Sequence, residues 1–277
     1  MLKAAVETTL IVVALLIWAG ASPAADLHPI VEVQSGYLFG ASSDGKWIKA
    51  DETAKLISDE TTYRVYGLTQ ALGEAKSGKP KPEDVPCEET LFVELSPKPE
   101  KGLIAIAAPW NALPRTPKVV DATQKAYVDV VRDFLKTKGI EQPKVKIDNI
   151  LRVDLDGDGE EEVLISATNY FSKDGHVPMR SPAASYSMVL LRRMVAGKVE
   201  TQLVEGEFYP KAYPTPTDND ASFNAPNAYK VIGCFDLDGD GKLEIVVHSQ
   251  YYEGEMTTIY KCDPKKAEAV LSVGCGA

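Results

Sequence analysis

Short runs of alternating hydrophobic and polar residues, typical of β-strands with one buried face, extend along most of the chain. In the first half such runs cover residues 36–40, 61–68, 90–95 and 103–107, with polar turns between them. Helical spacing of apolar residues is clearest between Asp121 and Gly139, where it includes Tyr127, Val130 and Phe134. We therefore expect a mainly β (α+β) protein with one amphipathic helix, capped by Asp121 and packed on a sheet.

The second half of the chain contains a repeat. The first copy reads ILRVDLDGDGEEEVLISATNYF and the second reads VIGCFDLDGDGKLEIVVHSQYYEG. Each copy is followed by two more strand-like runs, and the first carries an insertion, Ser172–Ser185. Four strands joined by hairpins form a propeller blade or a small antiparallel sheet. We therefore expect the chain to divide into three parts. Residues 1–25 precede the folded protein, and residues 26–118 form an N-terminal α+β or β unit. Residues 119–277 contain the helix and the two repeats, at about 145–206 and 229–276.

Both repeats contain a loop with an acid at every second position, and these loops predict two structural Ca²⁺ sites. Calcium takes about 6–8 oxygen ligands, and the glycines of the loop let the backbone curl around one point. Carbonyl oxygens of Glu160 and Lys242 would complete the two shells. The expected carboxylate ligands are Asp154, Asp156, Asp158 and Glu162 in the first loop and Asp236, Asp238, Asp240 and Glu244 in the second.

The loops differ from an EF-hand, which begins in the same way. An EF-hand needs an acid at its twelfth position and a helix after the loop. Here the twelfth positions are Ile165 and Val247, and the following residues are β-branched strand formers. We therefore expect each ion to lie in the turn between two antiparallel strands.

Each copy contains a strand, then the pattern D-x-D-x-D-G-x-x-[DE], then a second apolar strand. This arrangement resembles the FG-GAP (VCBS-type) repeat of integrin-like β-propellers and many secreted bacterial proteins. The resemblance implies calcium bound between the first two strands of a blade, and a binding or structural role more often than catalysis. It covers the two quoted strings. The closing acid is Glu in place of the usual Asp, the phenylalanine-glycine and glycine-alanine-proline landmarks are missing, and two copies do not close a propeller.

The apolar run Leu10–Trp18, which follows Lys3 and precedes small residues, predicts a secretory signal peptide cleaved after Ala24 or Ala25. An uncleaved anchor is the rival interpretation, but a spanning helix needs about 20 apolar residues. The mature protein is then secreted or periplasmic, without a membrane span. Eight carboxylates of the two loops account for most of the formal net charge of −10. A nucleic-acid partner, which would need a basic face, is therefore not expected.

Four cysteines, Cys87, Cys234, Cys262 and Cys275, remain in the exported chain. Two disulfides are the expectation in an oxidising compartment, with three pairings left open. Zinc is the competing interpretation, although no pair has C-x-x-C spacing. Cys234 lies in an apolar strand pattern and is also a candidate for a buried free thiol.

No catalytic residue is assigned. His248 and the nearby Tyr251, Tyr252 and Glu253 are candidate ligand-binding residues, because tyrosine offers apolar area with a polar tip. The leading hypothesis is an exported calcium-binding protein that recognises a protein or carbohydrate partner through loops at 172–185 and 209–226. The alternatives are a calcium-stabilised hydrolase that uses His248 or Glu253 and a purely structural envelope protein. A pocket joining His248 to another titratable group would favour the enzyme.

Overall fold

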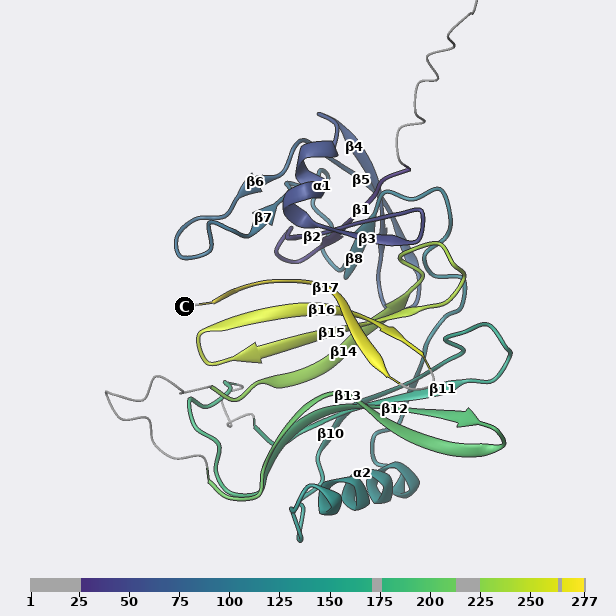
Figure 1. Ribbon diagram of the computed structural model, residues 1–277, viewed down its shortest axis with the longest axis vertical. Coiled ribbons are helices and arrows are strands. Elements are labelled where there is room, and N and C mark those ends of the chain that lie inside the picture. The colour runs from purple at the N-terminus through teal and green to yellow at the C-terminus, as the bar shows by residue number, and fades with distance from the viewer. Residues whose placement is uncertain (1–25, 171–175, 213–224, 264–265, 277) are drawn as a thin grey trace, which may run out of the picture.

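The computed structural model describes residues 26–170, 176–212, 225–263 and 266–276. The predicted signal peptide and parts of the two predicted recognition loops lie outside these ranges. The described chain is mainly β, as expected, and its three larger sheets are all antiparallel. Figure 1 shows the sheet of the second repeat between the N-terminal sheet and the sheet of the first repeat.

The N-terminal sheet is built from residues of the first half of the chain. Its strand order is β3 (Lys46–Lys49), β2 (Leu38–Ser43), β1 (His28–Glu32), β8 (Ile104–Ile106), β4 (Thr61–Tyr66) and β5 (Ala71–Ser77). A short helix, α1 (Ala50–Leu56), follows β3, and β6 (Lys81–Pro82) pairs with β7 (Leu91–Phe92). The predicted strands at 61–68 and 103–107 correspond to β4 and β8. The N-terminal unit is therefore of the α+β kind.

Each repeat forms one antiparallel meander in which consecutive strands are neighbours. The first sheet has the order β13 (Lys198–Tyr209), β12 (Ser185–Val195), β11 (Glu162–Thr168), β10 (Ile147–Val153) and β9 (Lys118–Val120). The second has the order β14 (Ala228–Phe235), β15 (Glu244–Tyr251), β16 (Gly254–Cys262) and β17 (Ala267–Gly276). The fifth strand of the first sheet, β9, is a three-residue strand that precedes α2.

Helix α2 (Lys125–Thr137) lies on the outer face of the first repeat's sheet (Figure 1). Its buried residues Val131 and Leu135 join a core that includes Ile150 and Ile165 of the sheet, as the periodicity predicts. The expected cap is wrong, because Gln124 stands at the N-cap. The carboxylate of Asp121 instead accepts hydrogen bonds from Thr123 N and Oγ1, both at 2.8 Å, so it closes a local turn before the helix.

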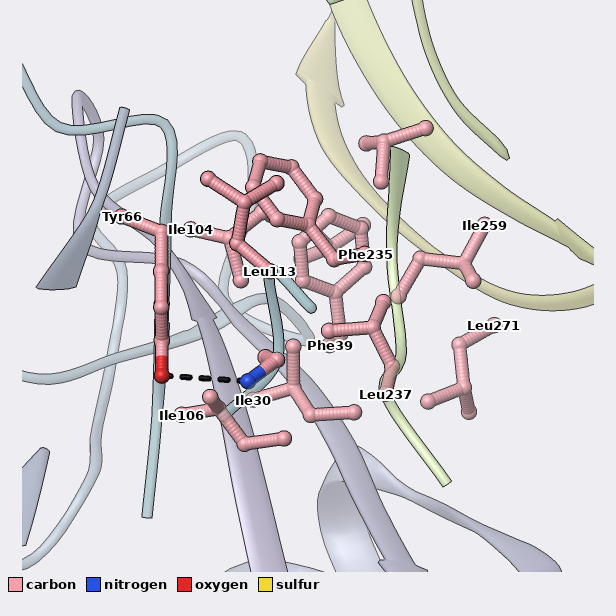
Figure 2. Packing of buried hydrophobic residues seen from close by; sticks show 13 residues of the cluster. Ile30, Phe39, Tyr66, Ile104, Ile106, Leu113, Phe235, Leu237, Ile259 and Leu271 are labelled. Carbon is pink, nitrogen blue, oxygen red and sulfur yellow. Dashed lines mark hydrogen bonds between the residues drawn. The ribbon is translucent and has the colours of Figure 1, made fainter. Parts of the chain in front are cut away.

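One hydrophobic core crosses from the N-terminal sheet into the second repeat. Figure 2 shows residues of β1, β2, β4 and β8 packed directly against residues of β14, β16 and β17. Ala112 reinforces this contact, because its N–H donates to Tyr66 Oη at 3.1 Å and its carbonyl accepts from Asp236 N at 2.8 Å. The core includes Ile30, Phe39, Tyr66, Ile104, Ile106, Phe235, Leu237, Ile259 and Leu271. Residues 26–118 therefore share their packing with the second repeat.

The described chain contains one disulfide where two were expected. Cys87 is bonded to Cys275, which attaches an N-terminal loop to β17. Cys234 and Cys262 are free. They lie on β14 and β16, which are separated by β15. Two strand spacings of about 4.8 Å each add up to more than the ~7 Å Cα separation that a disulfide tolerates. The strand order therefore prevents the second pairing.

Candidate metal centres

The two acidic loops occupy equivalent turns of the two repeats. The first connects β10 to β11 and the second connects β14 to β15. The last register pairs are Val153 with Glu162 and Phe235 with Glu244, so each closing glutamate lies across from the start of its loop. The glycines inside the loops have φ between +78° and +91°, a region that residues with a Cβ rarely adopt.

Three carboxylates converge in each loop. Asp154, Asp156 and Glu162 each place one oxygen within 4.8 Å of the others, and so do their counterparts Asp236, Asp238 and Glu244. Both clusters could hold a metal ion. Two of the predicted ligands, Asp158 and Asp240, are not part of these groups, and each instead accepts a hydrogen bond from the backbone N–H two residues further on, at 2.7 and 2.8 Å.

Backbone N–H groups orient the converging carboxylates. Asp154 accepts hydrogen bonds from Gly157 N at 2.7 Å and Gly159 N at 3.0 Å. Glu162 Oε2 accepts from Leu155 N at 2.7 Å. The second loop repeats the same three bonds. The leucine after each first aspartate is buried, so each loop is attached to the core as well as ordered internally.

The second cluster is more deeply buried than the first. Asp236, Asp238 and Glu244 are all buried, whereas Asp156 in the first loop is exposed. Burial, together with the charge of Asp238, raises the pKa of Glu244 to about 9. Burial also raises the pKa of Glu162 above its ordinary value. Burial of the Glu244 carboxyl therefore favours a bound proton or a neighbouring cation over an isolated negative charge.

A lysine that the sequence analysis missed reaches into the second loop. Lys261 Nζ on β16 lies 2.6 Å from Asp238 Oδ2 and 2.8 Å from Asp240 Oδ2. Although burial opposes its charge, the two carboxylates hold the pKa of Lys261 above its ordinary value. In the first sheet, Val163 pairs with Arg192, so Arg193 occupies the position equivalent to Lys261. The placement of a basic residue at this position of each repeat follows from strand register, which the sequence pattern did not specify.

The two loops lie against each other and are joined by Arg115. Its Nε donates to Asp154 O at 2.5 Å, and Nη2 donates to Leu155 O at 3.2 Å and to Gly241 O at 2.7 Å. A direct backbone bond links Leu243 N to Leu155 O at 2.8 Å. Arg115 lies just before β9, in a stretch where no local sequence pattern indicates a contact with the loops.

A cavity of about 410 Å³ opens at the junction of the loops. Its lining includes Asp156 and Glu162 from the first repeat and Glu244 and Lys261 from the second. Both closing glutamates therefore line the same cavity. The second loop is also attached to the N-terminal sheet, because Ser42 Oγ donates to Leu237 O at 2.7 Å.

The predicted ligand-binding residues do not form one group. His248 Nδ1 lies 3.2 Å from Thr257 Oγ1 and Nε2 lies 3.7 Å from Glu255, beside a space of only about 10 Å³. The rings of Tyr251 and Tyr252 meet edge to face at 5.9 Å, near the turn that contains exposed Glu253.

Comparisons of the chain with protein-family models, curated proteins and solved structures found no match. In the described part of the chain, no helix is long and apolar enough to cross a membrane.

Proposed function

We propose that the protein is an exported calcium-binding β-repeat protein of the FG-GAP (VCBS) type, with one structural Ca²⁺ in each loop and a role in binding a partner. One observation carries the proposal. In both repeats a buried glutamate closes a cluster of three carboxylates, and the cluster lies in the turn between the first two repeat strands of an antiparallel meander.

The donor set fits calcium best. Both clusters offer only oxygen, whereas zinc and copper sites usually include histidine or cysteine. Calcium tolerates irregular shells of about 6–8 oxygens, so the three carboxylates, the loop carbonyls of Glu160 and Lys242 and water can supply it. Magnesium demands near-ideal octahedral geometry. The bound ion would supply charge neutralisation, so the role of each site is structural.

Calcium would stabilise the junction at which all three sheets meet. Because Arg115 and the Leu243–Leu155 bond connect the loops, ordering either loop supports the other. An ion at ~100 times its dissociation constant adds about 2.7 kcal/mol of stability per site. This is a large share of the ~5–15 kcal/mol typical of a folded protein.

The surroundings of His248 favour binding over hydrolysis. The space beside His248 and Glu255 is about 10 Å³, which is too small to admit a substrate. A neighbouring cavity of about 430 Å³ is lined by Tyr229, Tyr251 and Tyr260, and His248 is not among its lining residues. The arrangement supports a recognition surface rather than a histidine-based active site.

Calorimetric titration of chelator-stripped residues 26–277 with Ca²⁺, and with Mg²⁺ as a control, tests the proposal. We expect two calcium equivalents for the wild type and one for each of Asp156→Ala and Asp238→Ala. Asp133→Ala, an exposed aspartate on α2, is the matched control and should keep both. Absence of calcium binding, or two equivalents in both loop variants, would contradict the proposal.

A further inference from the structure

A second cavity, of about 430 Å³, shares no lining residue with the acidic loops. Its walls come from β13, β14, β15, β16 and β17 and from the loop that contains Cys87. The disulfide to Cys275 and a bond from Thr90 Oγ1 to Gly274 O at 2.7 Å hold that loop in place. The volume suits a small organic molecule, because ligand sites usually enclose about 300–1,000 Å³.

Tyrosine and glutamate side chains are paired along one wall of this cavity. Tyr260 Oη donates to Glu205 Oε2 at 2.6 Å. Two other lining residues contact Glu207: Tyr229 Oη donates to Glu207 Oε1 at 3.0 Å, and Asn227 Nδ2 donates to the same oxygen at 3.0 Å. Because the phenols act as donors to the carboxylates, the rings and acids are fixed before any ligand arrives.

The charge of the lining is entirely negative. It contains Glu89, Glu205 and Glu255, and neither lysine nor arginine is among the lining residues. Within the described ranges, no lysine or arginine forms an ion pair with Glu205 or Glu255, and the one basic group near Glu255 is His248 at 3.7 Å. Glu205 is half-buried, so a cation entering the cavity would offset a charge that solvent screens only in part.

The acids are placed for a bulky cation rather than for a metal ion. Among the described residues, three-carboxylate groups with oxygens within 4.8 Å occur in the two acidic loops, and the glutamates of this cavity form no such group. The space between them is bordered by the rings of Tyr229, Tyr251 and Tyr260. Aromatic faces attract organic cations, and separated carboxylates add a favourable potential without requiring direct coordination.

We propose that this cavity binds an organic ammonium cation. The inference specifies the ligand class for the proposed binding role and is independent of calcium in the loops. The carboxylates provide charge complementarity, the tyrosine rings contact the alkyl groups around the nitrogen, and Tyr260 keeps Glu205 in position.

Two probes of the same shape test the charge requirement. Choline and its neutral carbon isostere, 3,3-dimethylbutan-1-ol, are titrated into residues 26–277 and followed by NMR. We expect saturable binding of choline and at least about tenfold weaker binding of the isostere, a difference that a single cation–π contact supports. Equal affinity for the two probes, or binding of neither, would overturn the proposal.

Variants then locate the site. Glu205→Gln and Glu255→Gln should each weaken choline binding about fivefold or more, while Glu200→Gln, an exposed acid on the same strand as Glu205, should not. Tyr260→Phe should weaken binding by releasing Glu205. Glu255 is exposed, so its variant tests the site even where Glu205→Gln fails to fold. Unchanged affinity in folded Glu205→Gln and Glu255→Gln would contradict the assignment.

A neutral sugar is the competing ligand for a cavity rich in tyrosine. Methyl β-glucoside is therefore titrated in parallel, and saturable binding of the sugar without binding of choline would replace the cation site by a sugar site. All titrations are run in excess calcium and again in chelator. Two bound calcium equivalents with no choline binding would reject this inference alone, while choline binding without calcium binding would reject the proposed metal sites alone.

Discussion

At the scale of single residues, Lys261 distinguishes the two loops most clearly. Its ammonium group lies between Asp238 and Asp240, where it neutralises charge that a bound calcium would also neutralise. The first loop has Arg193 at the equivalent strand position, and no ion pair between Arg193 and that loop occurs among the described residues. We therefore expect two loops with nearly the same sequence to differ in their affinity for a cation.

Replacing Lys261 by Met should raise the calcium affinity of the second loop about tenfold. The ion no longer has to displace a lysine held by two charge-assisted hydrogen bonds, each worth about 1.5–3 kcal/mol. Without calcium, the variant should be less stable than the wild type because buried Asp238 loses its cation. Titration of Lys261→Met in an Asp156→Ala background isolates the second loop. Lys242→Met, which removes an exposed positive charge from the same loop, is the control, and an equal effect there would contradict displacement.

Glu244 should make calcium binding to the second loop dependent on pH. In the metal-free fold its pKa is raised to about 9. The folded chain then retains a proton that the unfolded chain loses above its ordinary pKa of 4.5, so metal-free stability falls as pH rises from 4.5 to about 9. Bound calcium would displace that proton, so calcium affinity should increase up to about tenfold per pH unit between pH 6 and 8. Calorimetry in buffers of different ionisation enthalpy measures the number of protons released on calcium binding. Release of the same number of protons from Glu244→Gln would contradict the assignment of the proton to Glu244.

At the scale of elements, the short segment between the two halves, residues 111–121, contributes the strand β9 and the side chain of Arg115. Periodicity identified α2 and the strands β10, β11, β14 and β15, because one face of each is buried. The same reasoning missed β9 and misplaced the cap of α2, since three-residue strands and caps depend on contacts outside the local pattern. Arg115 lies in this segment and contacts both loops through their carbonyl groups.

Replacing Arg115 by Ala should lower the free energy of unfolding by about 2–4 kcal/mol in calcium. The change leaves three loop carbonyls without their donor, and hydrogen bonds to charged groups are worth about 1.5–3 kcal/mol but are not additive. Urea unfolding measures the change. Arg132→Ala, which removes an arginine paired with Asp129 along α2, should cost less than about 1 kcal/mol. Similar losses in the two variants would indicate that Arg115 does not join the loops.

At the scale of the whole molecule, the predicted boundary near residue 118 separates residues that share one core. Figure 2 shows Ile30, Phe39 and Tyr66 packed with Phe235 and Leu237 from the other side of that boundary. The disulfide between Cys87 and Cys275 joins the same two regions over a sequence separation of 188 residues. These contacts oppose independent folding of the two halves.

Residues 119–277 expressed alone should therefore lack a cooperative unfolding transition. The fragment would expose Phe235, Leu237 and Leu271, and each large apolar side chain left in water forfeits about 1.5–3 kcal/mol. Scanning calorimetry and near-ultraviolet circular dichroism, with residues 26–277 as the control, test this expectation. A cooperative transition of the fragment in excess calcium, near the melting temperature of residues 26–277, would show that the shared core is dispensable.

The sequence by itself determined the local features of this protein. Alternation of apolar and polar residues specified a mainly β chain, and the repeated acids and glycines specified two turns in which carboxylates converge, because these depend on neighbours within a few residues. Only the tertiary structure decided that Lys261 and Arg115 reach the loops, that β15 keeps Cys234 from Cys262, and that Tyr260 meets Glu205. Those contacts depend on strand order and sheet packing, which bring together residues far apart in the chain.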